Sequence, residues 1–261
     1  MKIHRIYAIL LRYLFFFRHS LDRLSDAFYW PTIDLVIWGI TSSYLKTIIS
    51  STQPIVILII SGIVLWYVVW RAEYELSVNV LEDIWDRNLI NIFVSPLKFS
   101  EWLTSLLLLG VIKAFISLLL TSLVALLLYK VHIFSYGFYL IPFFTLLMMT
   151  GWAVGFFVTG LILRFGARIQ TLAWSLVALI SPFCAIYYPL SALPGWAQKV
   201  AIFIPASYIF EGMRQVVNSH TLDPQKLYMS LILNIIYMIL ALIYLRKSFS
   251  KILQKGLINI D

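Results

Sequence analysis

Residues 54–70 read PIVILIISGIVLWYVVW and contain no charged side chain. At about 1.5 Å per residue, a helix of this length just crosses the roughly 30 Å hydrocarbon core of a bilayer. An uncharged run of this kind is typical of a membrane-spanning helix, so the segment is predicted to be one.

The composition agrees with this prediction. Of the 261 residues, 61% are hydrophobic and 12% are charged, and the mean hydropathy is +0.90. Soluble domains contain about 25% charged residues, so a water-soluble enzyme is excluded. The net charge is +8, but the basic residues flank apolar runs, and nucleic acid is therefore not expected as a partner. The single cysteine, Cys184, allows neither an intrachain disulfide nor a multi-cysteine zinc site.

Five further apolar runs predict membrane helices on either side of 54–70. They cover residues 31–45, 102–129, 136–163, 169–188 and 227–245. The expected fold is all-α, with six transmembrane helices in one domain that occupies residues 1–261. With the N-terminus inside, 14 of the 20 basic residues fall in cytoplasmic segments and five outside. This bias predicts two cytoplasmic termini. The membrane itself is expected to be a bacterial inner membrane.

Two segments outside these runs have amphipathic periodicity. Residues 1–27 carry apolar side chains three and four apart, interrupted by arginines and without a cleavage site, which predicts an interfacial helix rather than a signal peptide. Residues 78–97 are predicted to form a cytoplasmic segment whose helix covers residues 80–93 and is stopped by Ser95-Pro96. Its apolar face is expected to contain Leu81, Ile84, Trp85, Asn88, Leu89, Ile92 and Phe93, and its polar face Glu82, Asp83, Asp86, Arg87 and Asn91.

Residues 188–214 are apolar but are interrupted by prolines. Two short helical pieces of this length cannot each cross a bilayer, so an outer re-entrant hairpin is predicted, sheltered by protein or a water-filled cavity. Glu211 and Arg214 lie three residues apart and are expected to form a local ion pair at its end.

Two charged residues lie inside predicted spans. Lys113 is roughly 16 Å along its helix, near the midplane, where a charge costs on the order of 3 kcal/mol. It could serve the translocation path or an anionic headgroup, or be satisfied by a structural pair or by hydroxyls such as Ser117. Asp34 could pair with Arg71, and Arg71 could instead pair with Glu75.

Catalytic constellations do not occur in the sequence. It contains no phosphate-binding loop, no H-E-x-x-H zinc motif and no G-x-S-x-G elbow, and its four histidines are scattered. The chain is therefore expected to be no enzyme and to hold no cofactor or metal. Uphill transport would take its energy from a partner or from an ion gradient.

The order of these elements resembles ABC-2 type transporter permeases. The resemblance includes Ser95-Pro96-Leu97 after the cytoplasmic helix, then Leu193-Pro194-Gly195-Trp196, Ile204-Pro205 and Glu211-Gly212-Met213-Arg214. It implies a homodimeric exporter whose separate ATP-binding cassette subunit holds ATP and magnesium. It also implies ATPase coupling through Glu82, Trp85, Asp86, Arg87, Ser95 and Pro96, and an outer gate at Pro189, Leu193, Pro194, Trp196, Pro205, Glu211 and Arg214.

The substrate class stays open. Polysaccharide exporters of the family tend to carry an arginine-tyrosine and leucine-glycine-tryptophan pattern before the first span, whereas this chain has Phe28-Tyr29-Trp30-Pro31. An amphipathic drug or lipid is therefore preferred over a lipid-linked polysaccharide. The helix at 80–93 could also merely rest on lipid headgroups, and a secondary carrier or a membrane scaffold is the alternative from another class.

Overall fold

The computed structural model describes residues 1–48 and 54–255. This part of the chain is helical and contains no strand. Four helices are long and apolar enough to cross a membrane, or five if one bent pair counts as a single span. These features indicate a multi-pass helical membrane protein.

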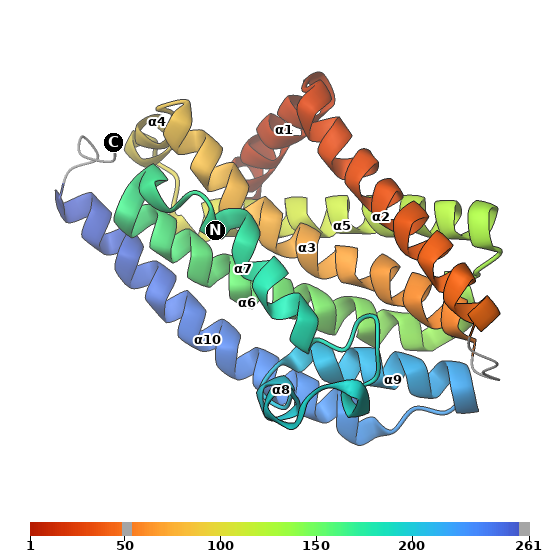
Figure 1. The fold of residues 1–261 in the computed structure, drawn as a ribbon. Coiled ribbons are helices and arrows are strands. Elements are labelled where there is room, and N and C mark those ends of the chain that lie inside the picture. The colour runs from red at the N-terminus through yellow and green to blue at the C-terminus, as the bar shows by residue number, and fades with distance from the viewer. Residues whose placement is uncertain (49–53, 256–261) are drawn as a thin grey trace.

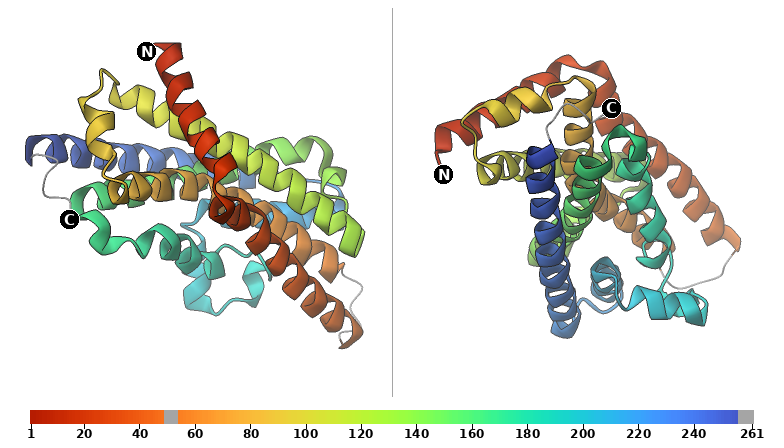
Figure 2. Two further views of the ribbon diagram at one scale, coloured as in Figure 1. Left: turned by 90° about the horizontal axis from the view of Figure 1, so that it is seen from above. Right: turned by 90° about the vertical axis from the view of Figure 1, so that its left-hand side faces the viewer.

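Long helices form the body of the molecule (Figure 1). They are α2 (Leu21–Ile48), α3 (Ile55–Trp85), α5 (Phe99–Tyr129), α6 (Leu140–Phe165) and α10 (Pro224–Lys255). α3 is central, because it packs on α2, α5 and α6. Helix α1 (Ile3–His19) crosses this bundle obliquely and packs mainly against α5 (Figure 2).

Glycines let α6 approach α3 closely. Gly151 and Gly155 lie four residues apart on α6. A Cβ added to Gly155 would lie 3.0 Å from Leu76 Cβ and 3.3 Å from Glu73 Cα. Small residues at this spacing allow helix backbones to pack tightly in a membrane, where van der Waals contact contributes strongly to association.

The helices α6 and α10 run parallel. Thr150 donates a hydrogen bond to Asn234 over 2.9 Å, and Gly160, ten residues later, packs against Tyr244. The intervening chain must therefore return from one end of the bundle to the other. It does so through α7 (Leu172–Ile180), the short turns η3 (Ser181–Phe183) and η4 (Leu190–Ala192), and helices α8 (Gly195–Ala201) and α9 (Pro205–Ser219).

Three predicted boundaries were wrong. The predicted helix at 80–93 is split, because α3 continues without interruption to Trp85 and a turn at Arg87, with φ of 52°, leads to α4 (Leu89–Val94). The interfacial helix ends at His19 rather than at 27, and residues 21–27 begin α2, which passes through Pro31. The predicted span at 169–188 contains only a short apolar helix, Leu172–Phe183. The number of six spans stays a prediction.

The remaining predicted helices agree with the structure. The runs at 54–70, 102–129, 136–163 and 227–245 lie in the helices Ile55–Trp85, Phe99–Tyr129, Ile133–Ile169 and Pro224–Gln254. The proline-interrupted segment at 188–214, the predicted outer segment, contains two short helices, α8 and α9, which are bent by 102° at the break before Pro205. Their depth in a membrane stays a prediction.

Candidate functional site

The break between α3 and α4 presents an exposed tip at one end of the bundle. Here the tip means residues 85–87 and 94–96. Trp85 is 47% exposed and Val94 is 79% exposed, while Asp86, Arg87, Ser95 and Pro96 are also exposed. Leu81, Leu89 and Ile92 are buried behind it. The tip is thus a polar and aromatic surface on a packed base.

Five of the six predicted coupling residues lie at this tip, but Glu82 does not. Its carboxylate faces the bundle, where it forms an ion pair with Arg23 of α2. Asp83, predicted on the same polar face, is 2% exposed and binds Arg12. The prediction of an outward acidic face was therefore wrong for these two acids. The side chain of Phe93 lies outside the described residues.

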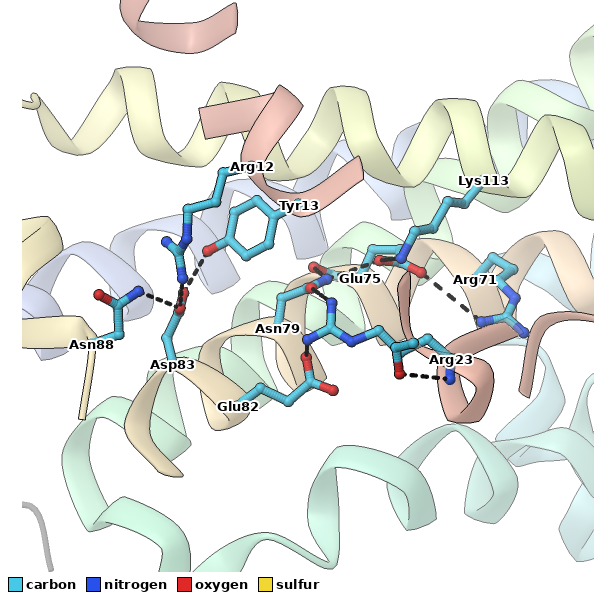
Figure 3. A network of polar contacts seen from close by, with 11 residues as sticks. Arg12, Tyr13, Arg23, Arg71, Glu75, Asn79, Glu82, Asp83, Asn88 and Lys113 are labelled. Carbon is cyan, nitrogen blue, oxygen red and sulfur yellow. Dashed lines mark hydrogen bonds and ion pairs between the residues drawn. The ribbon is translucent and has the colours of Figure 1, made fainter. Parts of the chain in front are cut away.

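A network of charged and polar side chains connects the C-terminal half of α3 with α1, α2 and α5 (Figure 3). Asp83 accepts hydrogen bonds from Arg12 and from the Tyr13 hydroxyl, each over 2.5 Å. Burial is the main cause that raises the pKa of Tyr13 well above its ordinary value, and the nearby Asp83 carboxylate raises it further. The hydroxyl is therefore neutral and can donate its hydrogen bond. These contacts fix α1 to α3.

The middle of the network is built around Glu75. Its Oε2 lies 2.7 Å from Lys113 Nζ and 2.8 Å from Asn79 Nδ2. Its Oε1 lies 3.9 Å from Arg71 Nη1, and Arg71 also contacts Asp26 Oδ2 over 3.1 Å. Lys113 is 6% exposed and Glu75 is fully buried. The structure therefore favours the structural-pair interpretation of Lys113.

Most of these partners were not predicted from the sequence. Glu75 lies four residues before Asn79, and Asn79 lies three residues before Glu82 and four before Asp83, which places these side chains on one face of a continuous helix. Together with Asp26, the acids in this network are matched by four bases, Arg12, Arg23, Arg71 and Lys113. The spacing of these polar residues could have indicated a shared face, but only if the helix was known to continue beyond Trp70.

The sequence suggested that Asp34 could pair with Arg71, but the structure shows no such pair among the described residues. Asp34 Oδ2 instead accepts a hydrogen bond of 2.6 Å from the Tyr67 hydroxyl. Among the ion pairs of the described residues, none includes Asp34 or the buried Glu73. These two acids differ in surroundings: Glu73 is 1% exposed in the α3–α6 contact, whereas Asp34 is partly exposed and borders a cavity.

The outer segment is held by the predicted Glu211–Arg214 pair, which is confirmed at 3.4 Å. Glu211 Oε1 also accepts a hydrogen bond from the Leu190 backbone over 2.8 Å, and Arg214 donates to the Ile186 carbonyl over 3.1 Å. One ion pair thus fixes both ends of the chain at 186–190 to α9.

The other predicted gate residues lie around this anchor. Pro189 begins the η4 turn, and Leu193 and Pro194 present their carbonyls to the first turn of α8. Trp196 is 65% exposed and packs edge-on against Phe183. Pro205 is buried at the first turn of α9, where its missing N–H needs no helical partner. All of them lie in the bent outer segment.

The described residues contain no cluster of three or more histidine, cysteine or acidic side chains that could hold a metal ion. Their arrangement offers two mechanical features instead: an exposed tip at the end of a long helix and a bent segment held by one ion pair.

A comparison with models of protein families finds no match to the chain, and a comparison with curated proteins finds no relative.

Proposed function

We propose that the chain is the permease subunit of an ATP-driven exporter for an amphipathic substrate. A separate ATP-binding cassette subunit hydrolyses ATP with magnesium and pushes on the tip. The order of elements and the short motifs that resemble ABC-2 type permeases support this proposal, and so does the geometry of α3.

The observation that carries the proposal is the connection between the tip and the bundle. α3 is a single helix from Ile55 to Trp85, so a force on the tip acts on one rigid element. The charge network connects the same helix to α1, α2 and α5. Arg5 of α1 donates a hydrogen bond to the Pro96 carbonyl at the tip. A load applied at residues 85–96 would therefore be distributed to several helices at once.

Both ends of the described chain support an even number of crossings. The Lys2 backbone N–H donates a hydrogen bond to the Glu101 carboxylate over 2.7 Å. Near the end of α10, the Phe249 ring packs against the Phe99 ring, with centroids 4.6 Å apart. Glu101 and Phe99 lie in the first turn of α5, beside the tip. The termini thus share the end of the bundle that carries the tip. Because α6 and α10 run parallel, the segment between them supplies the fifth of six crossings in this proposal.

The proposed membrane placement follows the charges. The basic residues concentrated at the two ends of the described chain and beside the tip support a cytoplasmic position for this end of the bundle. In this proposal the membrane is a bacterial inner membrane, and the bent α8–α9 segment lies at its outer face. There the Glu211–Arg214 pair would stabilise the closed gate.

In the proposed homodimer, the contact is made by the side of α2 that points away from the helix bundle. This helix falls outside the group of helices apolar enough to be spans by themselves, yet Ile37, Ile40 and Tyr44 are more than half exposed in one chain. A second copy would cover this face and enclose a path between the two halves.

A charge reversal at the tip tests the coupling. The variant Asp86→Lys with Arg87→Glu changes two exposed side chains at the tip. Its matched control is Lys247→Gln with Gln254→Lys, which also leaves the net charge unchanged and changes two exposed positions at the same end of α10. We expect the tip variant to lose stimulation of ATP hydrolysis in vesicles and the control to keep it, with equal membrane insertion. Equal stimulation in both variants would refute coupling through the tip.

A further inference from the structure

A cavity of about 500 Å³ lies between α2, α3 and the segment from α7 to Tyr187. Six of its ten lining residues are aromatic: Trp30, Trp66, Tyr67, Trp70, Trp174 and Tyr187. Asp26 and Asp34 also line it, and they contribute its only charged side chains among the described residues. The cavity thus combines aromatic walls with carboxylates.

Helical spacing brings these groups together. Asp26, Trp30 and Asp34 are four residues apart, so they share one face of α2. Trp66 and Trp70 have the same spacing on the facing helix α3. Both helices therefore present an aromatic side to the same space.

The two carboxylates differ in whether a basic side chain pairs with them. Asp26 Oδ2 lies 3.1 Å from Arg71 Nη1, and the Asp26 carbonyl accepts a second bond from Arg71 over 2.5 Å. Arg71 neutralises this acid. Asp34 accepts only a neutral hydroxyl, that of Tyr67, and no lysine or arginine of the described chain forms an ion pair with it. The cavity therefore keeps one uncompensated carboxylate.

We propose that this cavity binds an organic cation with an apolar body, such as a tertiary amine or a quaternary ammonium or phosphonium ion. Asp34 supplies the counter-charge, and the tryptophan and tyrosine rings supply faces that attract a cation. Aromatic walls also accept the apolar body, and the carboxylate repels anions. A metal ion fits less well, because Ca²⁺ and Mg²⁺ prefer several oxygen ligands.

This inference rests on the proposed function, since it narrows the amphipathic substrate of the exporter to a cation. One contact connects the cavity to the tip: Trp174, which lines the cavity, stacks on Trp85 with ring centroids 6.4 Å apart. A ligand against Trp174 would thus be sensed at the surface where the ATPase is proposed to bind.

The test uses two probes of similar shape and opposite charge, tetraphenylphosphonium and tetraphenylborate. Binding to the full chain in lipid nanodiscs is measured by equilibrium dialysis without any ATPase, and empty nanodiscs correct for partition into lipid. We expect saturable binding of the cation only. Asp34→Asn should weaken it roughly tenfold, as expected for the loss of about 1.4 kcal/mol of ion pairing, and Asp34→Glu should restore most of it.

A second pair of variants covers the case in which Asp34→Asn fails to fold. Trp30→Leu removes an aromatic wall, and Tyr44→Leu changes an exposed aromatic side chain of the same helix that does not line the cavity. We expect weaker cation binding in the first variant only. Equal affinity of wild type and Asp34→Asn, equal affinity of the two leucine variants, or preference for the borate would overturn the proposal. Because no ATPase is present, cation binding with a failed coupling test would refute only the proposed function.

Discussion

Nζ of Lys113 lies 2.7 Å from Oε2 of Glu75, and both side chains are buried between α5 and α3. Glu75 is also close to Arg71, which in turn contacts Asp26 of α2. One carboxylate thus neutralises a lysine in the middle of a predicted span and helps to hold three helices together. A charge at this depth is tolerable because its partner is already in place.

Replacing Glu75 is expected to destabilise the protein much more than replacing Glu73, two residues away. Glu75→Gln leaves Lys113 buried without its anion, which costs about 3–5 kcal/mol when one partner of a buried pair is removed. Glu73 is equally buried, but its Oε1 has no hydrogen-bond partner in the described structure. Glu73→Gln should therefore change the free energy of unfolding by only about 1 kcal/mol. Denaturant unfolding in micelles measures both, and equal losses would contradict the assigned pairing.

The sequence predicted the long apolar helices well, because their length and hydrophobicity are local properties. It did not predict the Lys113–Glu75 pair, because the uncharged run that predicts the span ends at Trp70 and Glu75 lies beyond it. In the structure α3 continues to Trp85, and these charges turn inward where α1, α2 and α5 supply partners. Such partners lie far away in the sequence, as Arg12 and Asp83 do. The Glu211–Arg214 pair could be predicted because it is formed within one helix turn.

The attachment of α1 should depend on the Tyr13 hydroxyl. Tyr13→Phe removes a hydrogen bond to a charged, buried acceptor, worth about 1.5–3 kcal/mol. We expect faster amide hydrogen exchange throughout α1. Tyr7→Phe is the control, because Tyr7 is 58% exposed on the same helix. If the two variants exchange alike, the Tyr13–Asp83 contact does not hold α1 in place.

The α3–α6 contact should not accept a side chain at Gly155. Gly155→Val places two methyl groups against Leu76 and the backbone at Glu73, so α6 must move away. We expect a lower yield of folded protein and a lower midpoint of thermal unfolding. Gly195→Ala is the control, since no atom lies within 4 Å of the added Cβ there. A normal midpoint for Gly155→Val would show that the helices are less closely packed than described.

The only cysteine reports on the outer segment. Cys184 is fully buried, two residues before Ile186, whose carbonyl accepts the hydrogen bond from Arg214. Arg214→Gln should loosen this segment and increase the rate at which a maleimide labels Cys184 in the folded protein. Lys199→Gln, which leaves these contacts intact, should label as slowly as the wild type. Unchanged labelling of Arg214→Gln would contradict the role of Arg214 as the anchor.

The most direct test of the exporter proposal is co-purification with an ATP-binding cassette ATPase encoded beside this chain, followed by ATP hydrolysis measured in proteoliposomes. The proposal predicts a stable complex whose ATPase rate rises when an amphipathic cation is added, and whose stimulation is lost with Asp86→Lys and Arg87→Glu. Absence of a complex, or a rate that no amphipathic compound changes, would contradict the assignment of this chain as the permease.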